Sequence, residues 1–263
     1  MNVGAIEILP VLDGIAKMKP TEAYTQTTEA DWAPHAAFLS DDGMLEMSLG
    51  GFLVRSGDRT VLVDAGVGRI NQGGFEGGRL LDSLAAHGVK PDDVTDVVFT
   101  HLHFDHVGWA TQQGSIIFPN ATYRCDARDW QHFVIGPDGG AARKLTPVTG
   151  RLETWSEDGT ILPGLDAMVA PGHTPGSTIV VVSSGTERAL LLGDVVHCPI
   201  ELVDDEWGGI GDVDPELALR TRQSLARELE RTDTPVAAAH FPGLVFGRLV
   251  KGESQRQWVI SGN

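Results

Sequence analysis

The segment Thr100-His101-Leu102-His103-Phe104-Asp105-His106 follows an apolar run and carries four side chains that can bind a metal ion. Imidazole nitrogen and carboxylate oxygen are ligands of borderline divalent cations such as zinc, and short spacings let one turn present several of them. Three further candidates, His173, Asp194 and His240, follow along the chain. This set of side chains predicts a site for two metal ions.

The ligand-rich segment lies among short β-branched runs and helical patterns. Buried strands are predicted at residues 51–55, 60–64, 96–100, 178–183 and 189–192. Helices are predicted over residues 79–87 and 215–231, the second beginning with Asp214 as its cap and Pro215 in its first turn. Strands that alternate with helices in two halves of the chain predict an α/β fold of two packed sheets covered by helices. The ligands then meet where the halves join.

Length and charge limit the architecture and the partners. A chain of 263 residues in this class is expected to form one domain, spanning residues 1–263. The formal net charge of −16 repels polyanions at long range, so we expect neither nucleic acid nor a membrane surface as a partner. A small neutral or cationic molecule is a more suitable partner for a protein of this charge.

The two cysteines, Cys125 and Cys198, are far apart and form no CxxC pattern. We therefore expect reduced, buried thiols, and neither a disulfide framework nor a thiolate zinc site. No apolar run reaches the length of a membrane span, and residues 1–10 lack the basic and apolar regions of an export signal. These features predict a cytoplasmic protein.

Several motifs occur in the order found in the metallo-β-lactamase superfamily, which this chain resembles over nearly its whole length. Residues 101–106 match the HxHxDH signature of that superfamily. The other matching segments are Leu62-Val63-Asp64-Ala65-Gly66, Pro171-Gly172-His173-Thr174-Pro175-Gly176, Leu192-Gly193-Asp194 and His240. The resemblance implies a four-layer αββα sandwich, an α/β fold that some schemes group with α+β.

The resemblance also implies a role for each ligand. One metal ion is expected on His101, His103 and His173, and the other on Asp105, His106 and His240. Asp194 is expected to bridge the two ions, because a carboxylate has two oxygens and can span a separation of about 3.5–4 Å. Asp64 is expected to orient a ligand by hydrogen bonding.

The histidine at position 103 bears on the identity of the metal. A glutamate there marks the diiron, oxygen-reducing branch of the superfamily, so His103 favours hydrolysis with two zinc ions. Manganese, cobalt or iron also suit a site of nitrogen and oxygen ligands. In such a site a hydroxide that bridges the two metal ions attacks an electrophilic carbonyl or phosphoryl centre.

Catalytic roles are expected for Asp105, Asp194 and His197. In the homoserine lactonases of this superfamily a tyrosine stands three residues after the bridging aspartate, and here that position holds His197. Two interpretations of His197 remain open at this point. It contacts the substrate oxygen or protonates the leaving group, or it is only structural.

The substrate class follows from the branch that the chain resembles. Residues 237–243 and 257–259 are similar to methyl parathion hydrolase and related esterases and lactonases, but Ser177 replaces a histidine common in both groups. The expected reaction is hydrolysis of a small, fairly apolar ester or lactone. Phosphotriester hydrolysis is the first alternative, and thioester hydrolysis or metal binding without catalysis are weaker ones.

Two further features bear on the shape of the site. The side chains predicted to line an apolar pocket are Met44, Phe104, Trp109, Phe133 and Trp207. The polar segment of residues 16–35 has no clear periodicity and is a candidate lid or dimer arm. A homodimer is expected from the family resemblance alone.

Overall fold

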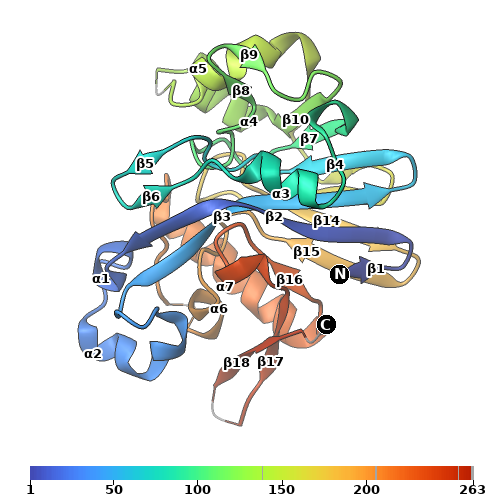
Figure 1. The fold of residues 1–263 in the computed structure, drawn as a ribbon. Helices are drawn as coiled ribbons and strands as arrows, with labels where there is room; N and C mark the ends of the chain where they lie inside the picture. Colours follow the sequence, from blue (N-terminus) through green and yellow to red (C-terminus); the bar gives the residue numbers. More distant parts are fainter. Residues whose placement is uncertain (138, 205, 254, 262–263) are drawn as a thin grey trace.

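The computed structural model describes residues 1–137, 139–204, 206–253 and 255–261, in which two β-sheets pack between layers of helices (Figure 1). The larger sheet has nine strands in these residues, in the order β11-β10-β7-β4-β3-β2-β6-β5, with β1 paired to β2. They are β1 (Asn2–Val3), β2 (Ile6–Met18), β3 (Leu45–Ser56), β4 (Arg59–Val63), β5 (Asn71–Gln72), β6 (Phe75–Glu76), β7 (Asp96–Val98), β10 (Thr122–Asp126) and β11 (Leu152–Trp155).

The smaller sheet is built from the second half of the chain, with neighbouring strands in sequence order. Its strands are β12 (Gly159–Leu162), β13 (Leu165–Val169), β14 (Thr178–Ser184), β15 (Glu187–Leu191), β16 (Val236–Ala237), β17 (Gly247–Lys251) and β18 (Arg256–Ile260). A separate hairpin consists of β8 (Thr111–Gln112) and β9 (Ser115–Ile116). Each half of the chain therefore contributes one sheet, as the alternating patterns predict.

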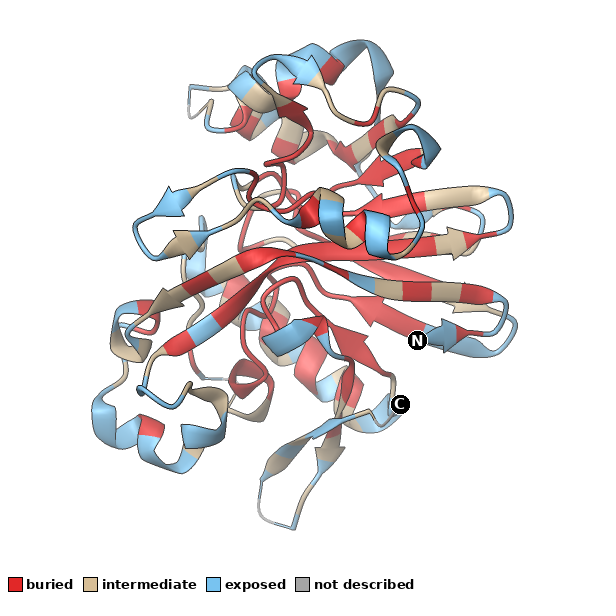
Figure 2. Cartoon of the chain, viewed as in Figure 1, coloured by how far each residue is buried: buried red, intermediate tan, exposed pale blue. Residues whose placement is uncertain are grey.

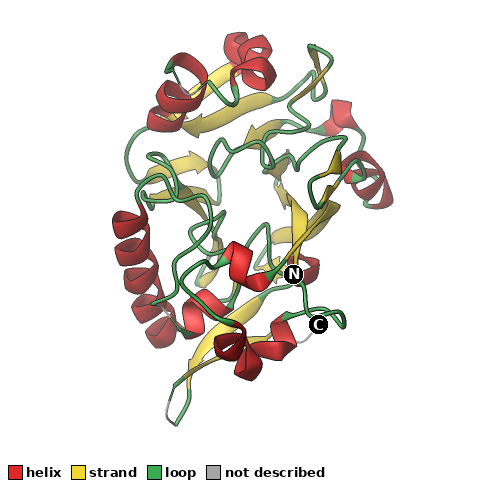
Figure 3. Ribbon diagram, turned by 90° about the vertical axis from the view of Figure 1, so that its left-hand side faces the viewer, coloured by secondary structure: helices red, strands yellow, loops and turns green. Residues whose placement is uncertain are grey.

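Helices cover the outer faces of both sheets, and Figure 3 shows the long helix α7 on one outer side. The α-helices are α1 (Pro20–Ala23), α2 (Glu29–Trp32), α3 (Leu80–Ala86), α4 (Ala127–Trp130), α5 (Ala142–Leu145), α6 (Ile200–Val203) and α7 (Pro215–Thr232). The 3-10 helices are η1 (Ala33–Phe38), η2 (Pro91–Asp93), η4 (Thr146–Arg151) and η5 (Pro242–Leu244), and η3 (Gln131–Ile135) is a π-helix. Among the described residues, no helix combines the length and apolar character needed to cross a membrane.

The central strands are buried on both faces, which explains their continuous apolar runs (Figure 2). In β14, Val180 and Val182 pack in the core between the two sheets, whereas Ile179 and Val181 pack in the core that includes α7. A strand covered on both faces carries an unbroken apolar run instead of an alternation. Each fully buried valine stabilises the fold by roughly 1.5–3 kcal/mol. The layers are those of the predicted αββα sandwich.

Most of the expected elements are present, with shifted ends. Helix α7 begins as predicted, because the Asp214 carboxylate accepts a hydrogen bond from the Leu217 N–H at 3.0 Å. The strand predicted at residues 96–100 ends at Val98, since the Thr100 N–H donates to the Asp64 carboxylate instead of to a neighbouring strand. Both cysteines are free and buried, as predicted.

The segment of residues 16–35 is packed against the fold along part of its length. Residues 16–18 form the end of β2, which the sequence analysis did not predict as a strand. Tyr24 and Trp32 are buried, and their rings lie 5.7 and 4.9 Å from the ring of Trp207. A role for this segment as a lid or dimer arm stays a prediction.

Candidate metal centre

The predicted ligands follow the ends of four strands that meet at one edge of the two sheets. Residues 101–106 form the loop after β7, and His173 lies in the loop between β13 and β14. Asp194 follows β15 and His240 follows β16, two strands that pair in parallel. Parallel pairing brings the carboxyl ends of two strands to the same edge, so residues 46 positions apart become neighbours.

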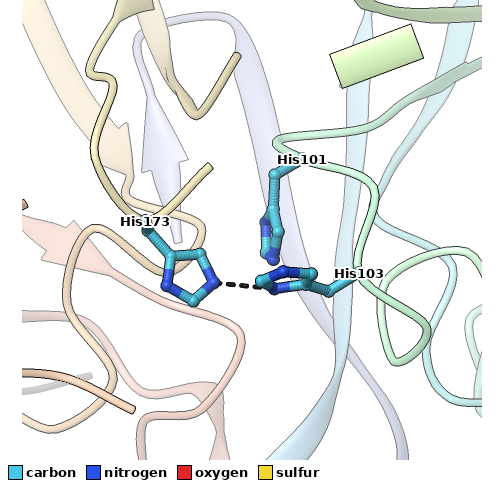
Figure 4. Close-up of side chains that lie close together, drawn as sticks. All are labelled: His101, His103 and His173. Atoms are coloured by element: carbon cyan, nitrogen blue, oxygen red, sulfur yellow. Dashed lines mark hydrogen bonds between the residues drawn. The ribbon is translucent and has the colours of Figure 1, made fainter. Parts of the chain in front are cut away.

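Three histidines expected on one metal ion point toward one another (Figure 4). The Nε2 of His173 lies 2.8 Å from the Nδ1 of His103, and ligand atoms of these two and of His101 all lie within 4.8 Å of one another. A second group of that kind consists of Asp105, His106 and His240. Each predicted set of three thus forms one close group. Two further groups, His101 with His106 and Asp194, and His173 with Asp194 and His197, overlap with them.

Asp194 lies between the two clusters. Its Oδ2 is 3.0 Å from the Nε2 of His240 and 3.2 Å from that of His106. The same oxygen is 3.6 Å from the Nε2 of His101 and 3.7 Å from that of His173. One carboxylate therefore faces histidines of both sets, the arrangement that a bridging ligand requires.

The donor set fits two divalent cations. The Nε2 of His101 and the Oδ1 of Asp194 are buried and have no hydrogen-bond partner among the described residues. A buried polar atom without a partner is costly, and coordination of a metal ion would satisfy both atoms. Neutral imidazoles with carboxylates are the donors that zinc takes in catalytic sites. The residues present therefore fit the metal ions that the sequence predicts.

Carboxylates and a carbonyl hold the other nitrogens of the histidine rings. Asp64 Oδ2 accepts from His106 Nδ1 at 2.9 Å, the contact expected from the sequence. The remaining contacts of this kind join His173 Nδ1 to Asp212 Oδ1 at 3.0 Å and His240 Nδ1 to the Ser48 carbonyl at 2.9 Å. Such contacts fix the tautomer and the orientation of a ligating ring.

Asp129 in α4 joins two of the ligand loops. Its carboxylate accepts hydrogen bonds from the Leu102 N–H at 3.1 Å and the Gly176 N–H at 2.6 Å. It also accepts from the Thr174 hydroxyl at 2.9 Å. The loop that carries His101 and His103 is therefore tied to the loop that carries His173.

Burial and neighbouring charges shift the pKa values of the cluster in opposite directions. Burial lowers the pKa of His101 well below 6.5, and the nearby His106 lowers it further. Burial also acts to lower the pKa of His106, but the carboxylates of Asp194 and Asp64 outweigh it and hold that pKa well above 6.5. For Asp194, burial acts to raise the pKa, and the surrounding histidines, led by His106, hold it well below 3.8. Asp194 therefore carries a negative charge, the form that binds cations.

A cavity of about 250 Å³ opens onto the ligands. Its apolar lining comes from Ala16, Met47, Phe75, Phe104 and Ile210, and its other lining residues are Gly211, His103, Asp105, His173, Asp194, His197 and His240. Phe104 lines it as predicted, and its ring lies 5.3 Å from that of Phe75. The cavity therefore combines an apolar wall with the polar cluster.

The other four predicted pocket residues do not line this cavity. Trp109 is buried in the core and donates its indole N–H to Asp13, and Trp207 packs on Tyr24 and Trp32. Phe133 lies behind His103, with the ring centroids 5.2 Å apart, and Met44 lies outside the lining. These four predictions were wrong: Trp109, Phe133 and Trp207 belong to the core, where an apolar residue in a chain of this size more often lies, and Met44 is half-buried outside the cavity.

His197 lines the cavity and lies among the ligands. Its Nε2 is 3.5 Å from Asp194 Oδ2, and its ring is 4.9 Å from that of His173. Asp212, Asp129 and the buried pair Glu201 and Arg222 also surround the ligands, and none of them was predicted from the sequence. Only Glu201 carries a local signal, since it lies four residues after His197, whereas the others come from distant elements.

Comparison with known proteins places the chain in a family. The sequence profile of the metallo-beta-lactamase superfamily matches residues 51–240. N-acyl homoserine lactonase AiiA of Bacillus thuringiensis subsp. kurstaki is 24% identical over 215 residues, which cover 75% of this chain and 82% of that protein. Metallo-beta-lactamase domain-containing protein 1 of Mus musculus is 32% identical over 194 residues, which cover 73% of this chain and 63% of that protein.

A solved structure shares the whole fold. The structure of AidC, a dizinc quorum-quenching lactonase in complex with the product N-hexanoyl-L-homoserine, superposes with a TM-score of 0.89 at 23% identity, covering 100% of this chain and 97% of that one. This likeness concerns the fold, and the sequence profile carries the assignment of the family. The chain belongs to the metallo-β-lactamase superfamily.

Proposed function

We propose that this protein is a dinuclear metal-dependent hydrolase that opens a small, fairly apolar lactone of the N-acyl homoserine lactone kind. One observation carries the proposal: Asp194 faces histidines of both ligand sets in the lining of an apolar cavity. The similarity to the lactonases AiiA and AidC supports a lactone as the substrate. The apolar wall suits an acyl chain, and the cluster suits the polar lactone ring.

Two zinc ions are the proposed cofactors, although manganese, cobalt or iron suit the same donors. One ion is assigned to His101, His103 and His173, the other to Asp105, His106 and His240, and Asp194 to both. When bound, such ions activate water as a nucleophile at neutral pH and polarise the oxygen of the carbonyl under attack.

The side chains of this protein orient the histidine ligands and supply a proton. Asp64 and Asp212 hold ring nitrogens of His106 and His173, so these two rings keep the orientation in which their other nitrogen faces the ligand cluster. His197 presents its Nε2 to the cavity beside Asp194. We assign His197 to the oxygen of the scissile bond, where the ring, when it carries a proton on both nitrogens, would stabilise the developing charge or donate its Nε2 proton to the leaving alkoxide.

Phosphotriester hydrolysis is the second candidate. The observation that favours it is the hairpin β17–β18, which carries residues 257–259, part of the segment that resembles methyl parathion hydrolase. The same activated water would then attack phosphorus instead of carbon. Thioester hydrolysis and metal binding without catalysis rank below both candidates.

The deciding experiment measures proton release on a pH-stat from zinc-loaded and chelator-stripped protein. A medium-chain acyl homoserine lactone, an aryl ester and an aryl dialkyl phosphate are compared at equal concentration. Zinc-dependent turnover that is fastest with the lactone supports the proposal, and a preference for the phosphate moves the protein to the second candidate. Zinc-loaded protein that is inert towards all three substrates and towards a thioester would leave only metal binding.

A pair of variants tests the role of His197. His197→Phe should lower kcat at unchanged zinc content, and full activity would contradict the assignment. His87→Phe is the matched control, because His87 bonds to the Pro10 carbonyl and lies outside the cavity lining. The single domain, the homodimer and the cytoplasmic location expected from the sequence stay predictions.

A further inference from the structure

A group of buried polar side chains lies behind the cavity and includes no predicted metal ligand. Its members come from the end of α1, from α6, from the loop before α7 and from α7 itself. They are Tyr24, Glu201, Asp212 and Arg222, whose side chains are each at most 3% exposed. Burying two carboxylates and a guanidinium is costly unless they meet one another, so their arrangement calls for a function.

Glu201 faces His197 with both carboxylate oxygens. Its Oε2 accepts a hydrogen bond from the backbone N–H of His197 at 3.1 Å, and its Oε1 lies 3.5 Å from the Nδ1 of the ring. That Nδ1 is buried and makes no hydrogen bond among the described residues, so the Glu201 carboxylate is the ion-pair partner that faces it. Because the two ring nitrogens point in different directions, a carboxylate that holds Nδ1 also decides where Nε2 points.

Glu201 is in turn held from two sides. The Tyr24 hydroxyl donates a hydrogen bond to Glu201 Oε1 at 2.5 Å, and Arg222 Nε lies 3.8 Å from Oε2. Burial acts to raise the pKa of Glu201, but the charge of Arg222 and contacts with His197 and Tyr24 hold it below 4.5. Glu201 is therefore an ionised acceptor that cannot turn away from His197.

Arg222 links this pair to the ligand His173. Its Nη2 lies 3.5 Å from Asp212 Oδ2, and the other oxygen of Asp212 accepts from His173. One guanidinium thus neutralises two carboxylates, each of which faces a histidine of the cavity. The backbone at Gly209 closes the other side of the His197 ring, since a Cβ there would lie 3.0 Å from Cε1 and Nδ1.

We infer that Glu201, held by Tyr24 and Arg222, is the positioning residue for His197 and keeps the Nε2 of that ring directed at the cavity. The segment of residues 16–35 is thereby coupled to His197, because Tyr24 belongs to it and donates a hydrogen bond to Glu201. The expected effect on turnover rests on the proposed function of His197. The orientation of the His197 ring by Glu201 does not depend on that function.

The test uses ¹⁵N-histidine-labelled, zinc-loaded protein and long-range ¹H–¹⁵N NMR spectra, with His197 assigned from His197→Phe. The unmodified protein is expected to show His197 protonated at Nδ1. In Tyr24→Phe the His197 signals should shift or broaden as the tautomers mix, and kcat should fall at least about tenfold at unchanged KM and zinc content.

The chain offers a matched control, because Tyr123 is its only other tyrosine. Tyr123 is also buried, and its hydroxyl contacts the carbonyls of Ala110 and Phe118 at 3.4 Å. Tyr123→Phe therefore loses a buried hydroxyl as well, and should leave the His197 signals and kcat unchanged.

A second pair of variants keeps the test decisive if Tyr24→Phe folds poorly. Glu201→Gln retains the shape and one acceptor and should keep more of the Nδ1-protonated form than Glu201→Leu. Unchanged His197 signals in Tyr24→Phe, or in Glu201→Leu if Tyr24→Phe does not fold, would overturn the inference. A changed ring signal in a protein inert towards every substrate would support the positioning role and reject the proposed function instead.

Discussion

Asp64 and His106 are joined by a hydrogen bond of 2.9 Å between Oδ2 and Nδ1, and Asp64 adopts a left-handed backbone conformation with φ +61°. Asparagine tolerates that conformation, so Asp64→Asn changes the acceptor without straining the backbone. We expect the affinity for the metal ion assigned to His106 to fall about 10–100-fold. Zinc titration against a chromophoric chelator measures this.

A buried carboxylate elsewhere provides the control for that prediction. Asp96 is fully buried and pairs with Arg59 and Arg124, away from the cavity. Asp96→Asn should lower the free energy of unfolding and leave zinc affinity intact. Equal zinc affinities for Asp64→Asn and the unmodified protein would show that Asp64 does not support the ligand.

Zinc binding should stabilise the folded chain. The ligands come from four separate loops, so the unfolded chain cannot present them together and zinc binds the native state preferentially. At a free zinc concentration a thousandfold above the dissociation constant, one site adds about 4 kcal/mol to the free energy of unfolding. Urea denaturation with and without zinc tests this, and coincident curves would argue against a preformed site.

Gly172 is expected to tolerate no side chain. Its φ is +135°, and a Cβ there would lie 2.3 Å from the backbone nitrogen of Ala218 in α7. Gly172→Ala should push α7 from the loop that carries His173, costing about 3 kcal/mol of stability and weakening zinc binding. A Cβ at Gly150 would meet no atom within 4 Å, so Gly150→Ala should change stability by no more than about 1 kcal/mol. Similar losses of stability in Gly172→Ala and Gly150→Ala would show that the close approach of Gly172 to α7 is not what matters.

Asp129 predicts a dependence of stability on pH. Burial raises the pKa of its carboxyl to about 6 from 3.8, so the folded state binds this proton more tightly than the unfolded state. Its stabilising contribution is complete below pH 3.8 and is lost as the pH rises through 6. The unfolding free energy of chelator-treated wild type, relative to that of Asp129→Asn, should therefore fall by about 2 kcal/mol between pH 4 and pH 7. The measurement is urea titration at both pH values. A difference in unfolding free energy that does not change with pH would reject the raised pKa of Asp129.

The sequence predicted the layers of the fold because its apolar runs are long enough to be read locally. The run at residues 178–183 is apolar on both faces, and β14 is indeed buried on both. The 13-residue strand β2 was not predicted, because it alternates irregularly and its stability comes from pairing with β3. Such pairing depends on β3, which lies further along the chain, so it cannot be read from the sequence of β2 itself.

The ligand residues could be found from the sequence alone, because metal coordination needs particular side chains at short spacings, and residues 101–106 supply four of them. The residues that hold these ligands could not be found that way. Asp129, Asp212 and Arg222 reach the site from α4, from a loop and from α7, and nothing local distinguishes them from surface charges. Most of the apolar lining of the cavity was missed for the same reason: Ala16, Met47 and Ile210 come from distant segments whose proximity only the packed sheets create. The sequence by itself thus determined which atoms can bind metal and which strands are buried, since both depend on local chemistry. The tertiary structure decided which charges orient those atoms and which side chains face the cavity, because these depend on contacts between residues far apart in the chain.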